Sequence, residues 1–182
     1  IAEGSDAGAH SLLALSGHYR PNAKVYCESP DILRAGRKVD EELFLGAGVN
    51  PFKYSVNSTY SQYLKMIQKI NAGAEFIVTQ AGLDMRKYDE VLRYCTMREL
   101  SIPLIARVTL VREDMIKDMR EGSFEPGVHC SREFANHIER EAESSGDFHA
   151  HQMQRLALQI IGCRLMGYNG VQIKGIRTAV QL

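Results

Sequence analysis

Five short apolar runs, each separated from the next by helical segments, place the strongest constraint on the fold of this chain. The clearest run is Phe76-Ile77-Val78, which is apolar at consecutive positions, as expected of a parallel strand covered on both faces. Gly73 precedes this run, where a helix end favours a left-handed residue. The other runs occupy residues 11–15, 42–49, 102–108 and 170–176. Strands and helices in this alternation predict βα units and a parallel sheet.

The length of the chain limits how much of an α/β architecture it can contain. With 182 residues, 45% of them hydrophobic, it can bury one substantial core. A complete (β/α)₈ barrel needs about 250 residues. We therefore predict one α/β domain over residues 11–182, a partial or complete (β/α)₈ barrel that resembles the later part of such a barrel. A five-stranded open sheet is the competing architecture, and residues 1–10 are predicted to be a loop without a part in the fold.

Local signals predict where several helices begin and which faces they bury. Ser29-Pro30-Asp31 is typical of an N-cap, a proline in the first turn and an early acidic residue. Ser58, Asp84 and Asp147 are predicted to cap three later helices. The last helix is predicted to bury the apolar stripe Met153, Leu156, Ala157, Ile160 and Ile161.

Composition excludes several classes of partner. Lys+Arg and Asp+Glu both number 22, and no basic cluster is present, which argues against nucleic acid as the main partner. No apolar run reaches about eighteen residues, so we predict no membrane span. A signal-peptide pattern is also absent, and we predict a cytoplasmic protein.

Cysteine and histidine spacing predicts no metal site. The four cysteines lie far apart, which favours reduced and mostly buried thiols. His149 and His151 are two residues apart and would not share a helix face. His10, His129 and His137 are scattered along the sequence.

The order and spacing of several motifs resemble a known family. The segments are LLALSG, VYCESPDIL, LGAGVNP, KMIQKINAGAEFIVTQ, IPLIARVTLV and GYNGVQIKGI. Over residues 11–176 this order resembles the C-terminal part of the methylenetetrahydrofolate reductase barrel. The most specific piece is K-x-x-AGA-x-x-x-x-TQ, from Lys69 to Gln80. The resemblance implies an FAD-dependent enzyme of one-carbon metabolism that reduces methylenetetrahydrofolate to methyltetrahydrofolate with NAD(P)H as electron donor.

The resemblance also implies a substrate-binding residue. Gln80 matches the family glutamine that hydrogen-bonds the pterin ring of folate. A carboxamide offers a donor and an acceptor side by side, which suits the mixed edge of a pterin. The structural alternative is a glutamine that only satisfies loop backbone. The segment from His129 to Arg140 corresponds to a family region that helps to wall the folate site.

Candidate flavin-binding residues follow from the same resemblance. Lys69 matches a lysine on the helix beside the nucleotide half of FAD, and Lys65 lies on the same polar stripe, where ammonium groups could meet a pyrophosphate. An ordinary solvated helix face is the alternative for both lysines. The remaining cofactor-binding candidates that the resemblance implies are Ser16, Gly17, His18, Tyr26, Cys27 and Asn50.

The catalytic turn departs from the family pattern. The family LRGD turn is Leu15-Ser16-Gly17-His18 here, so its arginine and aspartate are both replaced. His18, the catalytic candidate, could donate a hydrogen bond but could not replace a carboxylate as an anion. Asn50 stands where the family usually has tyrosine, and Tyr54 where it often has histidine. The family's general acid, a glutamate, belongs to a part of the barrel outside this sequence.

These observations leave two main functional hypotheses. The first is a reductase of the methylenetetrahydrofolate reductase type. The alternative is a catalytically divergent folate- or flavin-binding subunit that works with a partner protein. Because a partial barrel exposes sheet edges, we also expect a homo-oligomer or a partner subunit. An unrelated α/β domain is the third possibility.

Overall fold

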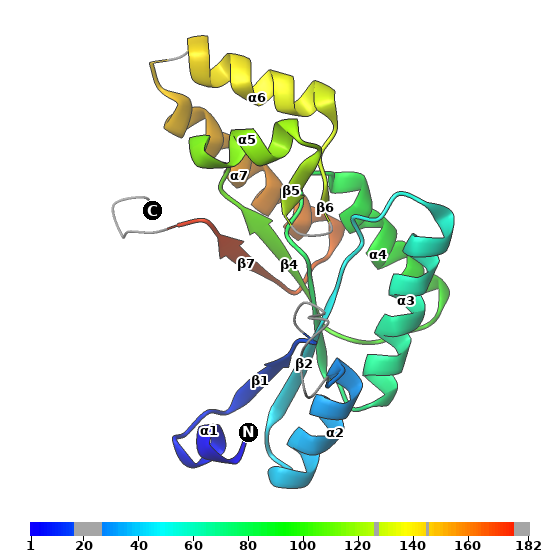
Figure 1. The fold of residues 1–182 in the computed structure, drawn as a ribbon. Coiled ribbons are helices and arrows are strands. Elements are labelled where there is room, and N and C mark those ends of the chain that lie inside the picture. Colours follow the sequence, from blue (N-terminus) through cyan, green and yellow to red (C-terminus); the bar gives the residue numbers. More distant parts are fainter. Residues whose placement is uncertain (17–26, 126–127, 145, 177–182) are drawn as a thin grey trace.

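The computed structural model describes residues 1–16, 27–125, 128–144 and 146–176. Figure 1 shows the chain, whose elements in order are α1 (Ala2–Asp6), β1 (Ser11–Ala14), α2 (Ser29–Val39), β2 (Phe44–Val49), α3 (Val56–Asn71), β3 (Phe76–Thr79), α4 (Met85–Met97), β4 (Leu104–Thr109), η1 (Glu113–Met115), α5 (Ile116–Arg120), β5 (Ser123–Glu125), β6 (Val128–His129), α6 (Arg132–Ser144), α7 (Phe148–Met166) and β7 (Gly170–Lys174).

The main sheet confirms the predicted α/β fold. Its strand order is β1-β2-β3-β4-β7, and every neighbouring pair is parallel. All five strands coincide with the five apolar runs. Sequential parallel strands with helices on the outside form a half-barrel, which corresponds to a partial (β/α)₈ barrel.

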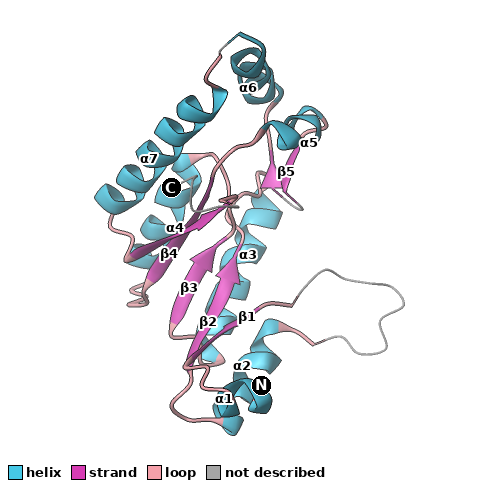
Figure 2. Ribbon diagram, turned by 90° about the vertical axis from the view of Figure 1, so that its left-hand side faces the viewer, coloured by secondary structure: helices cyan, strands magenta, loops and turns pink. Residues whose placement is uncertain are grey.

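The two faces of the sheet differ in cover. On one face, alternate strand residues such as Leu45, Ala47 and Ile77 are fully buried against the helix layer. Figure 2 shows this layer, with α3 and α4 behind the strands. On the other face, Phe44 is 45% exposed, and its ring stacks on that of Phe76 at 4.9 Å between centroids. We call this second face, which includes Phe44, Phe76, Ile105 and Arg107, the open face.

Capping residues explain where the helices begin. Asp84 and Asp147 cap α4 and α7 as predicted, accepting hydrogen bonds from Arg86 N and Ala150 N. The prediction for Ser58 is wrong, because the N-cap of α3 is Ser55, which accepts from Ser58 N. Since a cap must lie outside the helix, the earlier of the two serines takes this role.

The start of α2 also differs from the prediction by one residue. Ser29 is the first helical residue, and Glu28 occupies the N-cap position without a side-chain cap bond. Ser16, beyond the end of β1, supplies the acceptor instead, taking a hydrogen bond from Ser29 N at 3.0 Å. A residue distant in sequence thus performs the capping function.

The buried face of α7 corrects the predicted apolar stripe. Leu156 is buried as expected, but Ala157 and Ile161 are exposed, and Gln152 and Gln159 are buried in their place. Gln159 Nε2 donates to Gly82 O at 3.3 Å. Gln152 Nε2 donates to Glu141 Oε2 at 2.8 Å. Each glutamine donates to an acceptor on another element, which offsets part of the cost of burying its amide, although Gln159 Oε1 is buried without a partner among the described residues.

The segment between β4 and α7 forms an excursion beyond the carboxyl ends of the strands (Figures 1 and 2). It contains α5, the antiparallel pair β5–β6 and α6. The short pair was not predicted, because strands of two and three residues carry too little periodicity to be recognised. The excursion supplies one wall of the cavity described below.

Residues 1–10 differ from the predicted loop, since they contain the helix α1. Ser5 Oγ donates to Asp40 Oδ2 at 2.6 Å, and Phe44 N donates to His10 O at 2.9 Å. These two bonds tie the segment to the β2 region. The four cysteines are free thiols and all but Cys27 are buried, as predicted.

Candidate ligand site at the carboxyl ends of the strands

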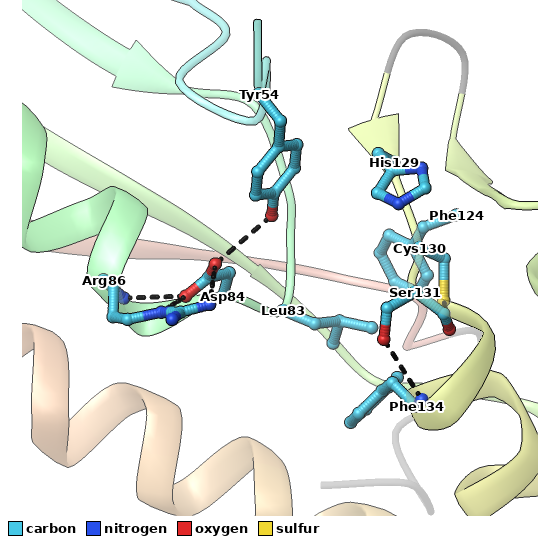
Figure 3. A pocket seen from close by; sticks show the side chains of 9 residues that line it. All are labelled: Tyr54, Leu83, Asp84, Arg86, Phe124, His129, Cys130, Ser131 and Phe134. Carbon is cyan, nitrogen blue, oxygen red and sulfur yellow. Dashed lines mark hydrogen bonds and ion pairs between the residues drawn. The ribbon is translucent and has the colours of Figure 1, made fainter.

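A cavity of about 490 Å³ lies beyond the carboxyl ends of β2, β3 and β4. This is the edge of a parallel α/β sheet at which ligands bind. Its lining is mostly apolar with a few polar groups. Figure 3 shows the residues that line it: Tyr54, Leu83, Asp84, Arg86, Phe124, His129, Cys130, Ser131 and Phe134.

Tyr54 and Asp84 form the polar part of the rim. Tyr54 Oη donates to Asp84 Oδ2 at 3.3 Å (Figure 3). Burial, and then the Asp84 carboxylate, raises the pKa of Tyr54 to about 12. The phenol therefore remains a neutral hydrogen-bond donor at physiological pH. Burial alone would raise the pKa of Asp84, but hydrogen bonds from Arg86 and Tyr54 hold it below its usual value.

His129 and Cys130 enter the cavity from the β5–β6 pair. The His129 ring meets the Tyr54 ring edge-on at 5.5 Å between centroids. The Cys130 thiol is buried, and burial raises its pKa, so the group behaves as a small apolar side chain. Sequence reasoning set His129 aside as scattered. The excursion after β4 brings His129 against Tyr54, which lies 75 positions earlier in the chain. The family resemblance, in contrast, had indicated that the segment from His129 to Arg140 helps to wall a ligand site.

Gln80 directly follows β3 and is not among the residues that line this cavity. It is half-buried, and its backbone N–H donates to Val49 O at 2.7 Å. Leu83 and Asp84, three and four residues further on, reach the cavity wall itself. Thr79, its partner in the TQ pair, is buried and accepts from Arg107 N at 3.0 Å, which gives it a structural role. The role of Gln80 in pterin binding stays a prediction.

The lysine predicted to meet a flavin nucleotide has a protein partner. Lys69 Nζ donates to Gly48 O at 2.6 Å. Gly48 is the residue of β2 that follows Ala47, where the pairing between β1 and β2 ends. Burial, and then the ammonium of Lys65, hold the pKa of Lys69 below its ordinary value, while Glu28 acts in the opposite direction. Lys65 itself is exposed. Asn50 Oδ1 accepts from Phe52 N at 3.1 Å, which shapes the loop after β2.

Only some of the other predicted flavin-binding residues belong to the described part of the chain. Gly17, His18 and Tyr26 fall outside the described residues. Cys27 is exposed, and Ser16 is engaged with Ser29 at the start of α2. Of the described members, Lys69, Asn50 and Ser16 make protein contacts, while Lys65 and Cys27 are exposed, and flavin binding stays a prediction. Within the described residues, no group of three or more His, Cys, Asp or Glu side chains could hold a metal ion.

Fold and site together define a class: an α/β half-barrel with a ligand-sized cavity at the carboxyl ends of its parallel strands. Among solved structures, this chain is similar to an uncharacterized protein from Clostridium thermocellum that binds two copies of 5-methyl-5,6,7,8-tetrahydrofolic acid. The TM-score is 0.56 at 18% sequence identity. The match covers 87% of this chain and 56% of the other, so our chain spans about half the length of that protein. No protein-family model and no curated protein matches the sequence.

None of the helices in the described ranges combines the length and apolarity that crossing a bilayer requires.

The electrostatics of Asp84 predict an acid-sensitive contribution to stability. Because its folded pKa is lowered, the carboxylate stabilises the native state above its unfolded pKa, and this contribution is lost as the pH falls through the folded value. Asp84→Asn keeps a capping oxygen but removes the charge. We expect the variant to lose less stability than the wild type between about pH 5 and pH 3, measured by urea unfolding. Asp89→Asn, which removes a half-exposed carboxylate of α4 that pairs with Arg93, serves as the charge-matched control.

Proposed function

We propose that this protein is a tetrahydrofolate-binding module that takes 5-methyltetrahydrofolate, or a close relative of it, at the carboxyl ends of its strands. The observation that carries the proposal is the cavity of about 490 Å³ at the strand ends of a half-barrel similar to a methyltetrahydrofolate-binding protein. Its volume falls within the range of small-molecule sites. The sequence resemblance around Gln80 supports the same ligand class.

The lining of the cavity suits the middle part of a folate. Phe124 and Phe134 supply aromatic surface against which a p-aminobenzoyl ring could pack. Tyr54 Oη, Ser131 and the Asp84 carboxylate are polar groups that could fix its orientation. A pocket that is mostly apolar with a few directed polar groups is typical of small-molecule recognition.

Binding of 5-methyltetrahydrofolate to the purified chain, measured by isothermal titration calorimetry, tests this proposal. Tyr54→Ala removes one wall of the cavity and should weaken binding about tenfold, the loss expected of one aromatic contact with its hydrogen bond. Tyr60→Ala is the matched control, since Tyr60 is a similarly exposed tyrosine on α3 that does not line the cavity. The absence of saturable binding to the wild type, or equal losses in the two variants, would contradict the proposal.

A reductase of the methylenetetrahydrofolate reductase type is the second candidate, supported by the K-x-x-AGA-x-x-x-x-TQ motif. It requires FAD and NAD(P)H, and the flavin would supply the hydride transfer. We prefer the binding module because Lys69, Asn50 and Ser16 of the flavin set are engaged in protein contacts and the LRGD turn is replaced. Visible absorbance after incubation with FAD, followed by NAD(P)H oxidation in the presence of methylenetetrahydrofolate, separates the two. A flavin-loaded and active protein would favour the reductase.

A further inference from the structure

Arg107 lies in the interior of the sheet, on the open face. It belongs to β4, in which Leu104, Ala106 and Val108 are buried on the helix side and Ile105 and Arg107 alternate with them. Parallel strands inside a barrel are usually apolar on both faces. A guanidinium at such a position faces either water or a ligand.

The contacts of Arg107 hold its position but leave its charge unneutralised. Arg107 Nε donates to Gln172 Oε1 at 2.7 Å, and the two residues are direct register partners on β4 and β7. Within the described part of the chain, the guanidinium has no carboxylate partner. The backbone is fixed as well, because Arg107 N donates to Thr79 Oγ1 and Arg107 O accepts from Tyr88 Oη at 2.6 Å. The terminal guanidinium nitrogens are thus presented from an anchored strand.

The register of β3 and β4 runs to Val78 and Ile105, and Gln80 comes directly after the last residue of β3. If this register continued for two more residues, Gln80 would lie opposite Arg107 on the open face. The open face therefore changes in character along the strands. Its amino-terminal part carries the Phe44–Phe76 stack, while its carboxyl-terminal part carries Arg107 and Gln172. The polar part lies at the ligand-binding edge of the sheet.

We propose that Arg107 binds the lactam edge of a tetrahydropterin ring, beside the pterin-binding Gln80 that the family resemblance implies, with Gln172 as the residue that positions Arg107. Neighbouring strands are about 4.8 Å apart, so their side chains can reach adjacent groups of one fused ring. The guanidinium donates to the electron-rich lactam oxygen, and the carboxamide pairs with the neighbouring ring N–H. This inference rests on the proposed function and assigns the pterin to the open face, with the p-aminobenzoylglutamate part towards the cavity near Tyr54.

Two ligand fragments and a small set of variants test the assignment by calorimetry. The fragments are 6-methyltetrahydropterin, which lacks the glutamate, and p-aminobenzoylglutamate, which lacks the pterin. Arg107→Met should weaken 6-methyltetrahydropterin and 5-methyltetrahydrofolate about tenfold, the loss expected for charge-assisted hydrogen bonds, and should leave p-aminobenzoylglutamate unchanged. Arg107→Lys keeps the charge without the planar fork and should give an intermediate loss. Arg93→Met, an exposed residue of α4 on the helix layer, is the control.

Gln172→Glu separates a positioning role from a structural one. The glutamate can still accept from Arg107 Nε, so the fold should be as stable as the wild type, but the new ion pair cancels the charge offered to the ligand. Affinity for 6-methyltetrahydropterin should therefore fall while the urea midpoint does not. If Arg107→Met weakens only p-aminobenzoylglutamate, or if a wild type that binds 5-methyltetrahydrofolate is unaffected by Arg107→Met, the assignment is overturned and the proposed function stands. A wild type that binds none of the three compounds overturns both.

Discussion

Replacing Gly82 by alanine should lower the free energy of unfolding by about 2–3 kcal/mol, the cost of overpacking a filled core. A Cβ at this position would lie 2.4 Å from two ring carbons of Phe52. Phe52 is only 1% exposed, and its ring meets that of Tyr88 edge-on at 5.2 Å between centroids. The ring therefore has no free space into which it could move. Urea unfolding of the wild type and Gly82→Ala measures the difference.

Gly46→Ala is the matched control for this prediction. A Cβ at Gly46 would lie even closer to an aromatic ring, 2.1 Å from the tip of Phe76. Phe76, however, is half-buried on the open face, where its ring can rotate into solvent. We expect a loss below about 1 kcal/mol, since exposed side chains relax at little cost. Equal losses at the two glycines would show that the freedom of the facing ring does not decide the outcome.

A second-site change tests the cause of the Gly82 effect. Phe52→Leu shortens the side chain that the new methyl group would meet. The double variant Gly82→Ala with Phe52→Leu should be less destabilised than the sum of the two single variants by about 1 kcal/mol or more, because the residues are in direct contact. Simple additivity would contradict the steric explanation.

Tyr88→Phe should destabilise the protein by about 1–3 kcal/mol, the cost of leaving buried polar groups without partners. Tyr88 is fully buried, and its hydroxyl group links three segments of the chain. It donates to Arg107 O at 2.6 Å and accepts from Gly82 N at 3.3 Å. The ring volume is unchanged in phenylalanine, so the measured loss reports on the hydroxyl group alone.

Tyr94→Phe is the opposite case on the same helix. Its hydroxyl oxygen is buried without a hydrogen-bond partner among the described residues. The ring stacks on Tyr63 at 4.5 Å between centroids, and phenylalanine preserves that contact. Removal of an unsatisfied buried hydroxyl should be neutral or stabilising by up to about 1 kcal/mol. A loss at Tyr94 equal to that at Tyr88 would contradict the role of hydrogen bonding in both predictions.

Tyr88 also connects the core to the proposed ligand site. By accepting from Gly82 and donating to the carbonyl of Arg107, it fixes the loop that follows Gln80 against β4. Gln159 of α7 reaches the same loop through Gly82 O. The residues proposed to meet the pterin are therefore held by buried groups rather than by a flexible loop, which is the arrangement expected for a preorganised site.

The sequence by itself determined the order of strands and helices, because apolar runs and helical stripes depend only on residues that are close together in the sequence. The caps Asp84 and Asp147 and the left-handed Gly73 were predictable for the same reason, since each depends on groups within three or four residues. Where capping depended on a distant residue, as with Ser16 at the start of α2, the local pattern placed the helix start one residue late.

Only the tertiary structure decided which polar groups are buried and which meet. Gln152 and Gln159 are buried because acceptors on Glu141 and Gly82 lie opposite them. The hydrophobic periodicity of α7 cannot predict these acceptors, since they belong to other segments of the chain. Tyr54 meets His129, and Arg107 meets Gln172, across 75 and 65 residues of chain. Such pairs depend on strand register and on the path of the excursion after β4. Those features are set by the packing of the whole chain, whereas propensity and periodicity act only over a few turns.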